Sequence, residues 1–373
     1  MSETLINGPV NVARLEGKIG SVPKVIYLFM DRHDSVVHQT ECTDIFAKDV
    51  NTYFVDTFKE IKGSDTTYDF FMETNLGESK ESQSDSFFQL RERYIDDMIR
   101  LFTGLFRFDN DSNKIKINEV FENVRLHYLD IRDHLQVTIR DEYQLDNVLG
   151  RINPRNLKLR DLKLVSFELK SIRDNLQKLL DLFSKPIGSN NTVIDDSNIP
   201  YNLDPKIVSY FVRKMEDQYH HQDVKKILND ALQKLLSMGK EIMAHINQLI
   251  AKYDSLVKEK TLLPSHILFD ETYPIIDEGL INFYARLTDI FMLRRFLDKD
   301  YITNAITYSG IAHSSYYINV LVNRFGFKLT HLANKTGSLA LTLKDIKAGN
   351  KGTSIFMQQG QCSDMTSFPK HFL

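Results

Sequence analysis

Four short apolar runs, rich in β-branched and aromatic residues, each lead into an acidic side chain or a histidine. Stretches with helical periodicity separate these runs along the chain. Runs of this length and composition are typical of buried strands in a parallel sheet. The sequence therefore predicts an α/β fold in which helices flank a mostly parallel sheet. We expect the four strands at residues 24–30, 68–73, 123–129 and 304–308.

Between the third and fourth predicted strands the pattern becomes mostly helical. Apolar residues recur at helical spacing in one stripe from Val165 to Phe183 and in a longer stripe from Val224 to Leu256. The simplest arrangement is a long helical hairpin inserted into the α/β domain. We therefore divide the chain into a first part of the α/β domain (1–132), the hairpin insertion (133–262), a second part of the α/β domain (263–335) and a weakly ordered tail (336–373).

Polar side chains that follow the predicted strands are the candidates for chemistry. In an open parallel sheet the carboxyl ends of the strands line the ligand crevice, so side chains at these ends meet although the sequence scatters them. We expect six side chains to converge there: Asp31, His33, Glu73, His127, Asp130 and His313.

The first two strands offer a histidine and two carboxylates. Alternation along extended backbone points Asp31 and His33 to the same side, which suits a metal or a histidine base oriented by a carboxylate. The alternative is a turn aspartate beside a surface histidine. Glu73 closes an apolar run, where burial would raise its pKa and suit general acid or base chemistry. Its alternative is a glutamate that emerges into solvent.

The segment after the third strand has two polar faces. His127 would lie on one face of a regular strand, whereas Asp130 and Arg132 would lie on the other. Either a turn begins within the segment or one set is structural. An ion pair between Asp130 and Arg132, or between Arg125 and Glu73, is the alternative to a binding role.

His313 follows the fourth strand and a glycine. Gly310 allows a tight turn from strand to helix, which brings backbone N–H groups near a ligand. A histidine at a helix N-terminus is favoured in its neutral form, which suits a metal ligand or a base. The alternative is a helix-start histidine that faces solvent. Asp289, on the preceding predicted helix, is a supporting candidate whose alternative is a solvated helix face.

Composition and motifs exclude several functions. The formal net charge of −3 disfavours general nucleic-acid binding. No apolar stretch reaches the roughly 18 residues of a membrane-spanning helix, so we expect no membrane partner. A P-loop, a Gly-x-Gly-x-x-Gly fingerprint and a Gly-x-Ser-x-Gly elbow are all missing from the sequence, which disfavours nucleotide-driven and serine-hydrolase chemistry.

The segments that carry these candidates resemble an uncharacterised protein family of large nucleocytoplasmic DNA viruses. The resemblance covers most of the α/β part, the tail around Cys362 and little of the hairpin, and its motifs lie at residues 27–33, 70–73, 125–132 and 308–313. The two cysteines are far apart in sequence, and the N-terminus lacks the features of a signal peptide. We therefore expect a reducing location, the host cytoplasm or the virion.

A more distant resemblance links the chain to the erythromycin-esterase and Tiki-protease superfamily, which includes metal-dependent and metal-independent hydrolases. The shared pattern is a carboxylate-x-His after the first strand, a Glu after the second and a late Gly-x-x-His. This likeness implies that the site residues are Asp31, His33, Glu73 and His313. Met30 stands where the superfamily usually has Gly, and its bulky side chain is expected to crowd the turn that presents Asp31 and His33.

The resulting hypothesis is a hydrolase-like viral protein with an unknown substrate. Its catalytic residues would be Asp31, His33, Glu73, His127 and His313 around one crevice, with Asp130, Arg132 and Asp289 in support. A divalent metal held by Asp31, His33, Glu73 and His313, or a histidine, would activate water, and Glu73 would move the proton.

Two alternatives remain. The first is a non-catalytic virion or host-interaction protein that keeps the α/β fold and uses the hairpin for self-association or for a virion partner. The second is a nucleic-acid enzyme that uses the acidic cluster with metal ions.

Overall fold

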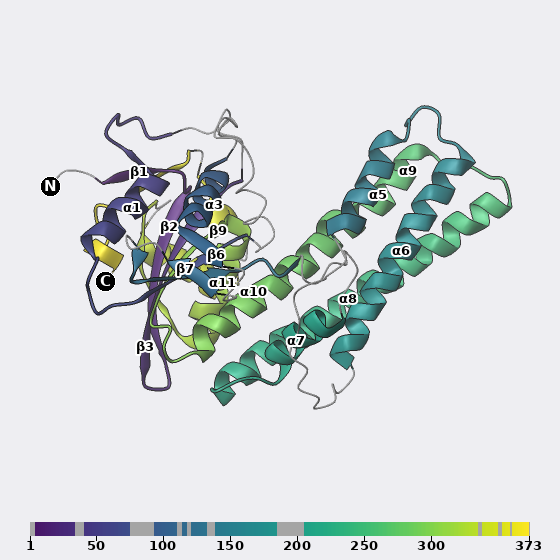
Figure 1. Ribbon diagram of the computed structural model, residues 1–373. Helices are drawn as coiled ribbons and strands as arrows, with labels where there is room; N and C mark the ends of the chain where they lie inside the picture. The colour runs from purple at the N-terminus through teal and green to yellow at the C-terminus, as the bar shows by residue number, and fades with distance from the viewer. Residues whose placement is uncertain are drawn as a thin grey trace. The chain divides into compact units, whose positions relative to one another are not determined.

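The computed structural model describes residues 4–33, 41–74, 93–109, 114–117, 121–132, 139–184, 205–334, 338–349, 353–358 and 360–372. The chain forms two compact units (Figure 1): an α/β unit (Met1–Asp130 and Arg295–Leu373) and a helical unit (Ile131–Arg294). The predicted α/β fold with an inserted pair of long helices is confirmed. The helical unit extends to Arg294 rather than to residue 262, because the helices that follow pack with it.

The main sheet of the α/β unit has six strands in the order β10-β2-β3-β9-β5-β8. Strands β3, β9, β5 and β8 run parallel, and β2 is antiparallel to both β3 and β10. The four predicted strands are thus the four parallel ones, whereas β2 was not anticipated because charged residues interrupt its apolar pattern. The strands are β2 (Asn11–Ile19), β3 (Val22–Asp31), β5 (Tyr68–Met72), β8 (Val124–Tyr128), β9 (Asn304–Gly310) and β10 (Lys328–Leu332).

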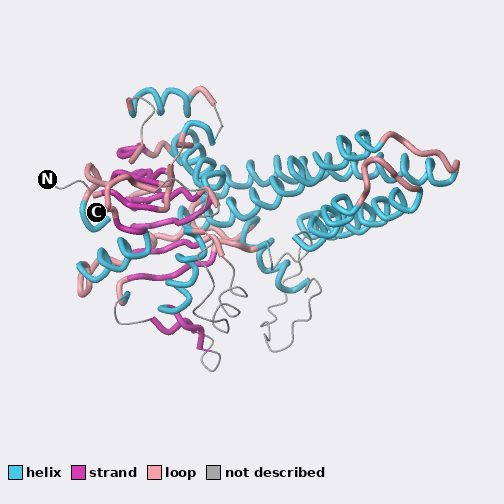
Figure 2. Tube along the Cα trace, turned by 90° about the horizontal axis from the view of Figure 1, so that it is seen from above, coloured by secondary structure: helices cyan, strands magenta, loops and turns pink. Residues whose placement is uncertain are grey.

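Helices lie on both faces of this sheet (Figure 2). On one face, α1 (Val50–Glu60) and α3 (Tyr94–Leu105) enclose a largely aromatic core, in which Phe70 stacks on Phe102 with ring centroids 4.1 Å apart. On the other face, α11 (Ile311–Phe325) packs against β3 and β9, with α12 (Leu339–Lys347) beside it. Successive strand residues alternate between these faces, so a residue's position in its strand decides which core it meets.

The C-terminal segment is built into the α/β unit. β1 (Leu5–Asn7) pairs with both β4 (Lys48–Asp49) and β11 (Cys362–Asp364). Cys42 and Cys362 form a disulfide across 320 residues. Phe368 and Phe372 are buried in the aromatic core. The structure therefore differs from the weakly ordered tail that was expected, because strand pairing and buried phenylalanines hold this segment. Short elements complete the unit: β6 (Phe106–Asp109), β7 (Lys114–Ile117), η4 (Thr353–Ile355) and η5 (Lys370–Phe372).

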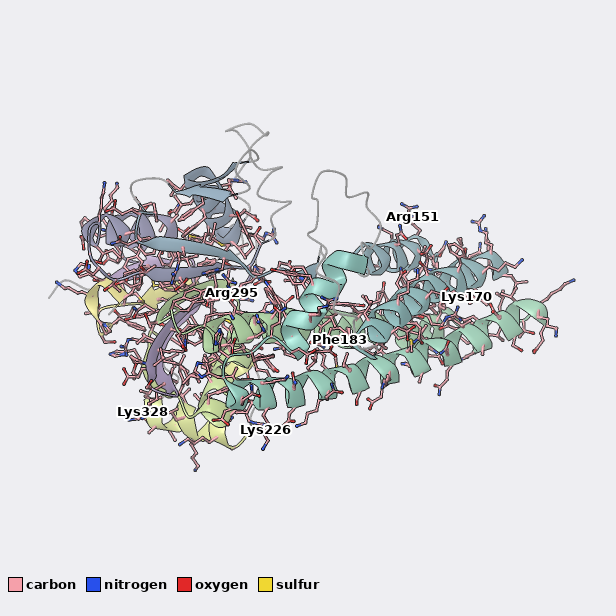
Figure 3. The ribbon with its side chains drawn as sticks, turned by 60° about the horizontal axis from the view of Figure 1, so that its bottom comes forward. Arg151, Lys170, Phe183, Lys226, Arg295 and Lys328 are labelled. Carbon is pink, nitrogen blue, oxygen red and sulfur yellow. A yellow bond between two sulfur atoms is a disulfide. The ribbon has the colours of Figure 1, made fainter. Side chains whose placement is uncertain are left out.

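The helical unit has a mostly aliphatic core. The two predicted stripes fall on α6 and α8, which pack against each other, and most of their apolar side chains are buried. Figure 3 labels Lys170 and Phe183 on α6. The segment between the two stripes, residues 185–204, lies outside the described residues. The helices are α5 (Ile139–Arg151), α6 (Leu159–Ser184), α7 (Pro205–Glu216), α8 (Gln222–Lys258), α9 (Ser265–Pro274), η3 (Ile275–Leu280) and α10 (Ile281–Asp298), whose residues from Arg295 onward belong to the α/β unit.

Throughout the described part of the chain, no helix combines the length and the apolar character needed to span a membrane.

Candidate functional site

The register of three neighbouring strands brings acidic and histidine side chains to one edge of the sheet. Asp31 at the end of β3 is opposite Gly310 at the end of β9. Met72, the last residue of β5, is opposite Tyr308, so Glu73 emerges at the same level. The Glu73 N–H donates to the Tyr308 carbonyl at 3.2 Å, which extends the ladder by one bond. The strand ends therefore meet where the sequence predicted.

Glu73 is the centre of this edge. Its Oε2 accepts the Gly310 N–H at 2.6 Å and lies 3.4 Å from Nε2 of His33. Its Oε1 lies 3.2 Å from Nε2 of His313. Gly310 is the N-cap of α11, so the carboxylate sits at the positive end of the helix dipole. We call Asp31, His33, Glu73 and His313 the acid–histidine cluster.

Asp31 shapes the turn that presents His33. The aspartate is fully buried; its Oδ1 accepts the His33 N–H at 2.6 Å and its Oδ2 accepts the Tyr308 hydroxyl at 2.9 Å. His33 adopts a left-handed backbone conformation with φ of 58°, which is uncommon for residues other than glycine. The Asp31 carboxylate thus positions His33 through the backbone N–H of the histidine. Sequence reasoning missed Tyr308, because a tyrosine at the end of an apolar run is an ordinary core residue.

Gly310 provides space rather than backbone flexibility. Its φ of −53° and ψ of 147° are available to any residue, so the tight turn does not require glycine. A Cβ at this position would lie only 2.6 Å from Nε2 of His33 and 3.4 Å from Oε2 of Glu73. The missing side chain therefore lets the imidazole and the carboxylate meet.

The pKa values of Glu73 and His33, which form the central ion pair, shift in opposite directions. Burial raises the pKa of Glu73, but the charges of His313 and His33 and their hydrogen bonds outweigh burial and hold this pKa well below its usual value. Burial lowers the pKa of His33, but the hydrogen bond and charge of Glu73, and then the charge of Asp31, outweigh it and raise this pKa. Burial also raises the pKa of Asp31. An ionised carboxylate thus stabilises an imidazolium.

The cluster is open to solvent on the side of His33. The His33 side chain is 34% exposed, whereas those of Glu73 and His313 are 10% and 9% exposed. A group that exchanges protons with a substrate must be reachable, and a buried carboxylate behind a histidine stabilises the charged ring. The arrangement can therefore take up and release a proton at His33.

His127 lies outside this cluster, contrary to the expected convergence. Its Nε2 is 2.7 Å from Oδ1 of Asp69, and its ring stacks on Phe71. His127 is opposite Phe71 in the register and turns away from the aromatic core, whereas Asp31 lies on the same face of β3 as Tyr27 and Phe29, which belong to this core. Burial lowers the pKa of His127 despite its bond to Asp69. The one-residue alternation of a strand explains the separation.

Asp69 is a polar centre that sequence reasoning missed. It is fully buried and accepts two bonds from Arg125, at 2.8 and 2.6 Å. Arg125 thus pairs with Asp69 and not with Glu73, which had been the structural alternative. The available signal was a single acid inside an apolar run, since a buried carboxylate requires a partner.

The supporting candidates divide between the two units. β8 ends at Tyr128, so the chain leaves the strand before Asp130, as one of the two alternatives held. Asp130 is buried, and its N–H donates to the Thr74 carbonyl at 3.3 Å. Arg132 and Asp289 belong to the helical unit, where Asp289 pairs with Arg286 at 2.5 Å.

Met30 does not obstruct the turn. It is buried inside β3 and, by strand alternation, its side chain points to the face opposite Asp31. The departure from the superfamily pattern is therefore compatible with the observed contacts of Asp31 and His33.

The described residues do not form a metal-ligand set. Among them, no group of three or more His, Cys, Asp or Glu side chains is arranged to hold a metal ion. In the acid–histidine cluster, both oxygens of Asp31 and Oε2 of Glu73 accept N–H or O–H donors. The cluster fits a hydrogen-bonded network better than a metal site, and the divalent metal stays a prediction.

The fold and the site together define an α/β protein with a mixed, largely parallel sheet and an acid–histidine cluster at the strand ends. The chain belongs to a family of unknown function (DUF5847), which it matches over residues 4–263 and 267–373. The match includes the helical unit, of which the expected resemblance covered little, as well as the α/β unit.

Relatives in Acanthamoeba polyphaga mimivirus, a giant DNA virus, match over almost the whole chain. Uncharacterized protein R706 is 36% identical, with 99% of this chain and 97% of the relative covered. R161 is 34% identical, with 98% of each covered, and R160 is 32% identical, with 99% and 97% covered. No solved structure matches the chain.

Proposed function

We propose that this protein is a viral hydrolase whose acid–base centre is the acid–histidine cluster. The observation that carries the proposal is a buried Glu73 carboxylate shared by two histidines, of which only His33 is substantially open to solvent. The distant resemblance to esterases and proteases supports the same four residues. Esters are therefore the first substrate class to test.

In this proposal His33 is the proton carrier. Its neutral imidazole takes a proton from a water molecule, whose oxygen attacks the acyl carbon of the substrate. Glu73 stabilises the resulting imidazolium, which then gives the proton to the leaving alcohol. Asp31 positions His33 through the backbone bond, and His313 and the Gly310 N–H orient the Glu73 carboxylate.

The test is hydrolysis of short-chain p-nitrophenyl esters by the full chain. His33→Gln and Glu73→Gln should each lower kcat/KM by about 10²-fold or more, the usual contribution of acid–base catalysis. The control is His266→Gln, since His266 is an exposed histidine on α9 of the helical unit. Equal rates for the parent chain and both cluster variants would contradict the proposal.

The raised pKa of His33 adds a pH signature. The neutral ring is the base, so kcat/KM should rise with pH through an apparent pKa above 6.5, the ordinary value for histidine. A profile that stays flat across this region would show that His33 is not the base.

A divalent metal on the same four residues is the weaker form of this proposal. Two imidazoles and two carboxylates are donors that such ions accept, but the described side chains are not arranged as a metal-ligand set. Elemental analysis of the purified protein tests it. Bound metal should be lost in His33→Gln and in His313→Gln, and full occupancy in both variants would rule this form out.

Self-association without catalysis is the alternative function. Leu164 and Phe167, less than one turn apart on α6, are 49% and 66% exposed, and such apolar positions favour contact with a second copy of the chain. Light scattering after size exclusion should show a larger species than the monomer, and L164S/F167S should restore the monomer. A monomeric parent chain would contradict this alternative.

A further inference from the structure

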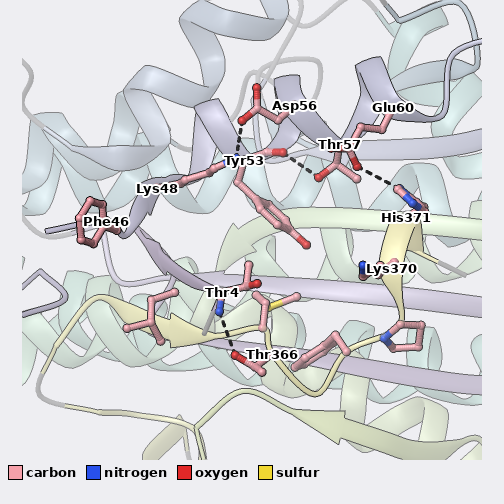
Figure 4. A pocket seen from close by; sticks show the side chains of 14 residues that line it. Thr4, Phe46, Lys48, Tyr53, Asp56, Thr57, Glu60, Thr366, Lys370 and His371 are labelled. Atoms are coloured by element: carbon pink, nitrogen blue, oxygen red, sulfur yellow. Dashed lines mark hydrogen bonds and ion pairs between the residues drawn. The ribbon is translucent and has the colours of Figure 1, made fainter. Parts of the chain in front are cut away.

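A cavity lies in the α/β unit, between α1 and the C-terminal segment. Its volume is about 440 Å³, within the range of pockets for small molecules. Figure 4 shows Tyr53, Asp56 and Glu60 on the α1 side, with Thr366 and Lys370 on the other. No residue of the acid–histidine cluster lines this cavity.

The ionisable side chains that line the cavity are two lysines, two carboxylates and a histidine. Lys48 pairs with Asp56 at 2.6 Å, and Nδ1 of His371 lies 3.5 Å from Oε2 of Glu60. Lys370 is exposed and has no such partner among the described residues. The Lys370 ammonium is therefore available to pair with an anionic group of a ligand.

A hydroxyl and apolar surface accompany this cation. The Tyr53 side chain projects into the cavity in Figure 4, and burial raises its pKa, so it remains a hydrogen-bond donor at neutral pH. Phe46, Met365 and Phe368 also line the space. Phe46 is 84% exposed, so its ring is accessible to a ligand. An apolar ligand body would cover it.

The two walls of the cavity are tied together. The Cys42–Cys362 disulfide joins the segments that lead into them, and β1 pairs with a strand from each wall. The Thr4 N–H also donates to Oγ1 of Thr366 at 2.9 Å. Such cross-links hold a pocket in shape before a ligand arrives, which lowers the entropic cost of binding.

We propose that this cavity binds a small organic monoanion with an apolar body, such as a medium-chain carboxylate. Lys370 and the Tyr53 hydroxyl bind the anionic group, and Phe46, Met365 and Phe368 contact the hydrocarbon part. The proposal is independent of hydrolysis at the acid–histidine cluster.

The test uses the aromatic sulfonate ANS as a fluorescent probe on the full chain. We expect saturable binding of one ANS per chain, displaced by octanoate but not by inorganic phosphate or octylamine. Lys370→Gln should weaken binding about fivefold, as expected for one exposed charge-assisted contact. Lys347→Gln, an exposed lysine on α12, is the matched control and should leave binding unchanged.

Two further variants show whether the probe occupies this cavity. Tyr53→Phe should weaken binding about threefold, which corresponds to one neutral hydrogen bond. C42S/C362S should also weaken it, because the walls are no longer linked. Displacement by octylamine as effective as by octanoate, or equal affinities for the parent chain and Lys370→Gln, would overturn the proposal.

Discussion

The two units of this protein reach their structures by different physical routes. The helical unit buries mostly leucine and isoleucine in stripes that the sequence displays directly. The α/β unit buries a largely aromatic core whose members come from both ends of the chain, and its polar groups meet only through strand register. The comparison shows that local periodicity places a helix, whereas a site at a sheet edge depends on distant pairing.

The largest expected effect tests the dependence of the α/β unit on its C-terminal residues. Phe372 is 2% exposed and contacts Tyr27, Phe54 and Phe58 in the aromatic core. Phe372→Ala should lower the free energy of unfolding by about 3–5 kcal/mol, the usual cost of removing a buried phenylalanine. Urea unfolding followed by circular dichroism measures this loss.

A matched variant in the helical unit sharpens the contrast. Phe167 is 66% exposed on α6, so Phe167→Ala should change stability by less than about 0.5 kcal/mol. A loss of stability for Phe372→Ala as small as that for Phe167→Ala would mean that the C-terminal segment does not belong to the core.

The second effect asks whether the helical unit also depends on close packing. A Cβ at Gly239 on α8 would lie 2.8 Å from the Phe283 ring, so Gly239→Ala should cost about 2 kcal/mol by overpacking. Gly150 on α5 has nothing within 4 Å of such a Cβ, so Gly150→Ala should instead stabilise by about 0.5–1 kcal/mol. Thermal unfolding of both variants measures the difference, and gains in both would show that the helices have room to separate.

The third effect is the pH dependence of the acid–histidine cluster. The folded-state pKa of Glu73 is lowered, so its stabilisation is present above pH 4.5 and is lost as pH falls through the lowered value. The folded-state pKa of His33 is raised, so its stabilisation is present below pH 6.5 and is lost as pH rises through the raised value. The pair therefore stabilises most between pH 4.5 and 6.5.

Glu73→Gln should cost about 1–2 kcal/mol in this window, because a hydrogen-bonded charge pair is lost. Urea midpoints at several pH values measure the difference between the parent chain and the variant, which should shrink toward acid pH. A constant difference would show that the Glu73 charge does not contribute.

The smallest expected effect comes from Glu216 in the helical unit, whose pKa is raised, whereas that of Glu73 is lowered. Burial, and then the charge of Asp217, raise the pKa of Glu216 to about 7. Its contribution to stability is therefore present below pH 4.5 and is lost as pH rises through about 7. Glu216→Gln should remove this loss, and the change should be small because the group is partly exposed. A comparison of melting temperatures at pH 5 and pH 8 tests the sign.

The sequence predicted more of the elements than of the contacts. The four parallel strands and the helices α6 and α8 follow from apolar patterns, and Asp31, His33, Glu73 and His313 were chosen because they follow strands. Strand β2 was missed because charged residues interrupt it. The position at which the C-terminal segment docks depends on the pairing of β11 with β1 and on the burial of Phe368 and Phe372, which no local pattern of the sequence shows.

Residue types and their periods along the chain determined the fold class, the two long helices and the polar side chains at the strand ends. The tertiary structure decided the rest: that His127 binds Asp69 on the other face, that Gly310 is needed for space and that Cys42 meets Cys362. The physical reason lies in the hydrogen bonds. A helix satisfies its backbone within a few residues, whereas a strand pairs with a distant segment whose register is set by burial in the whole unit.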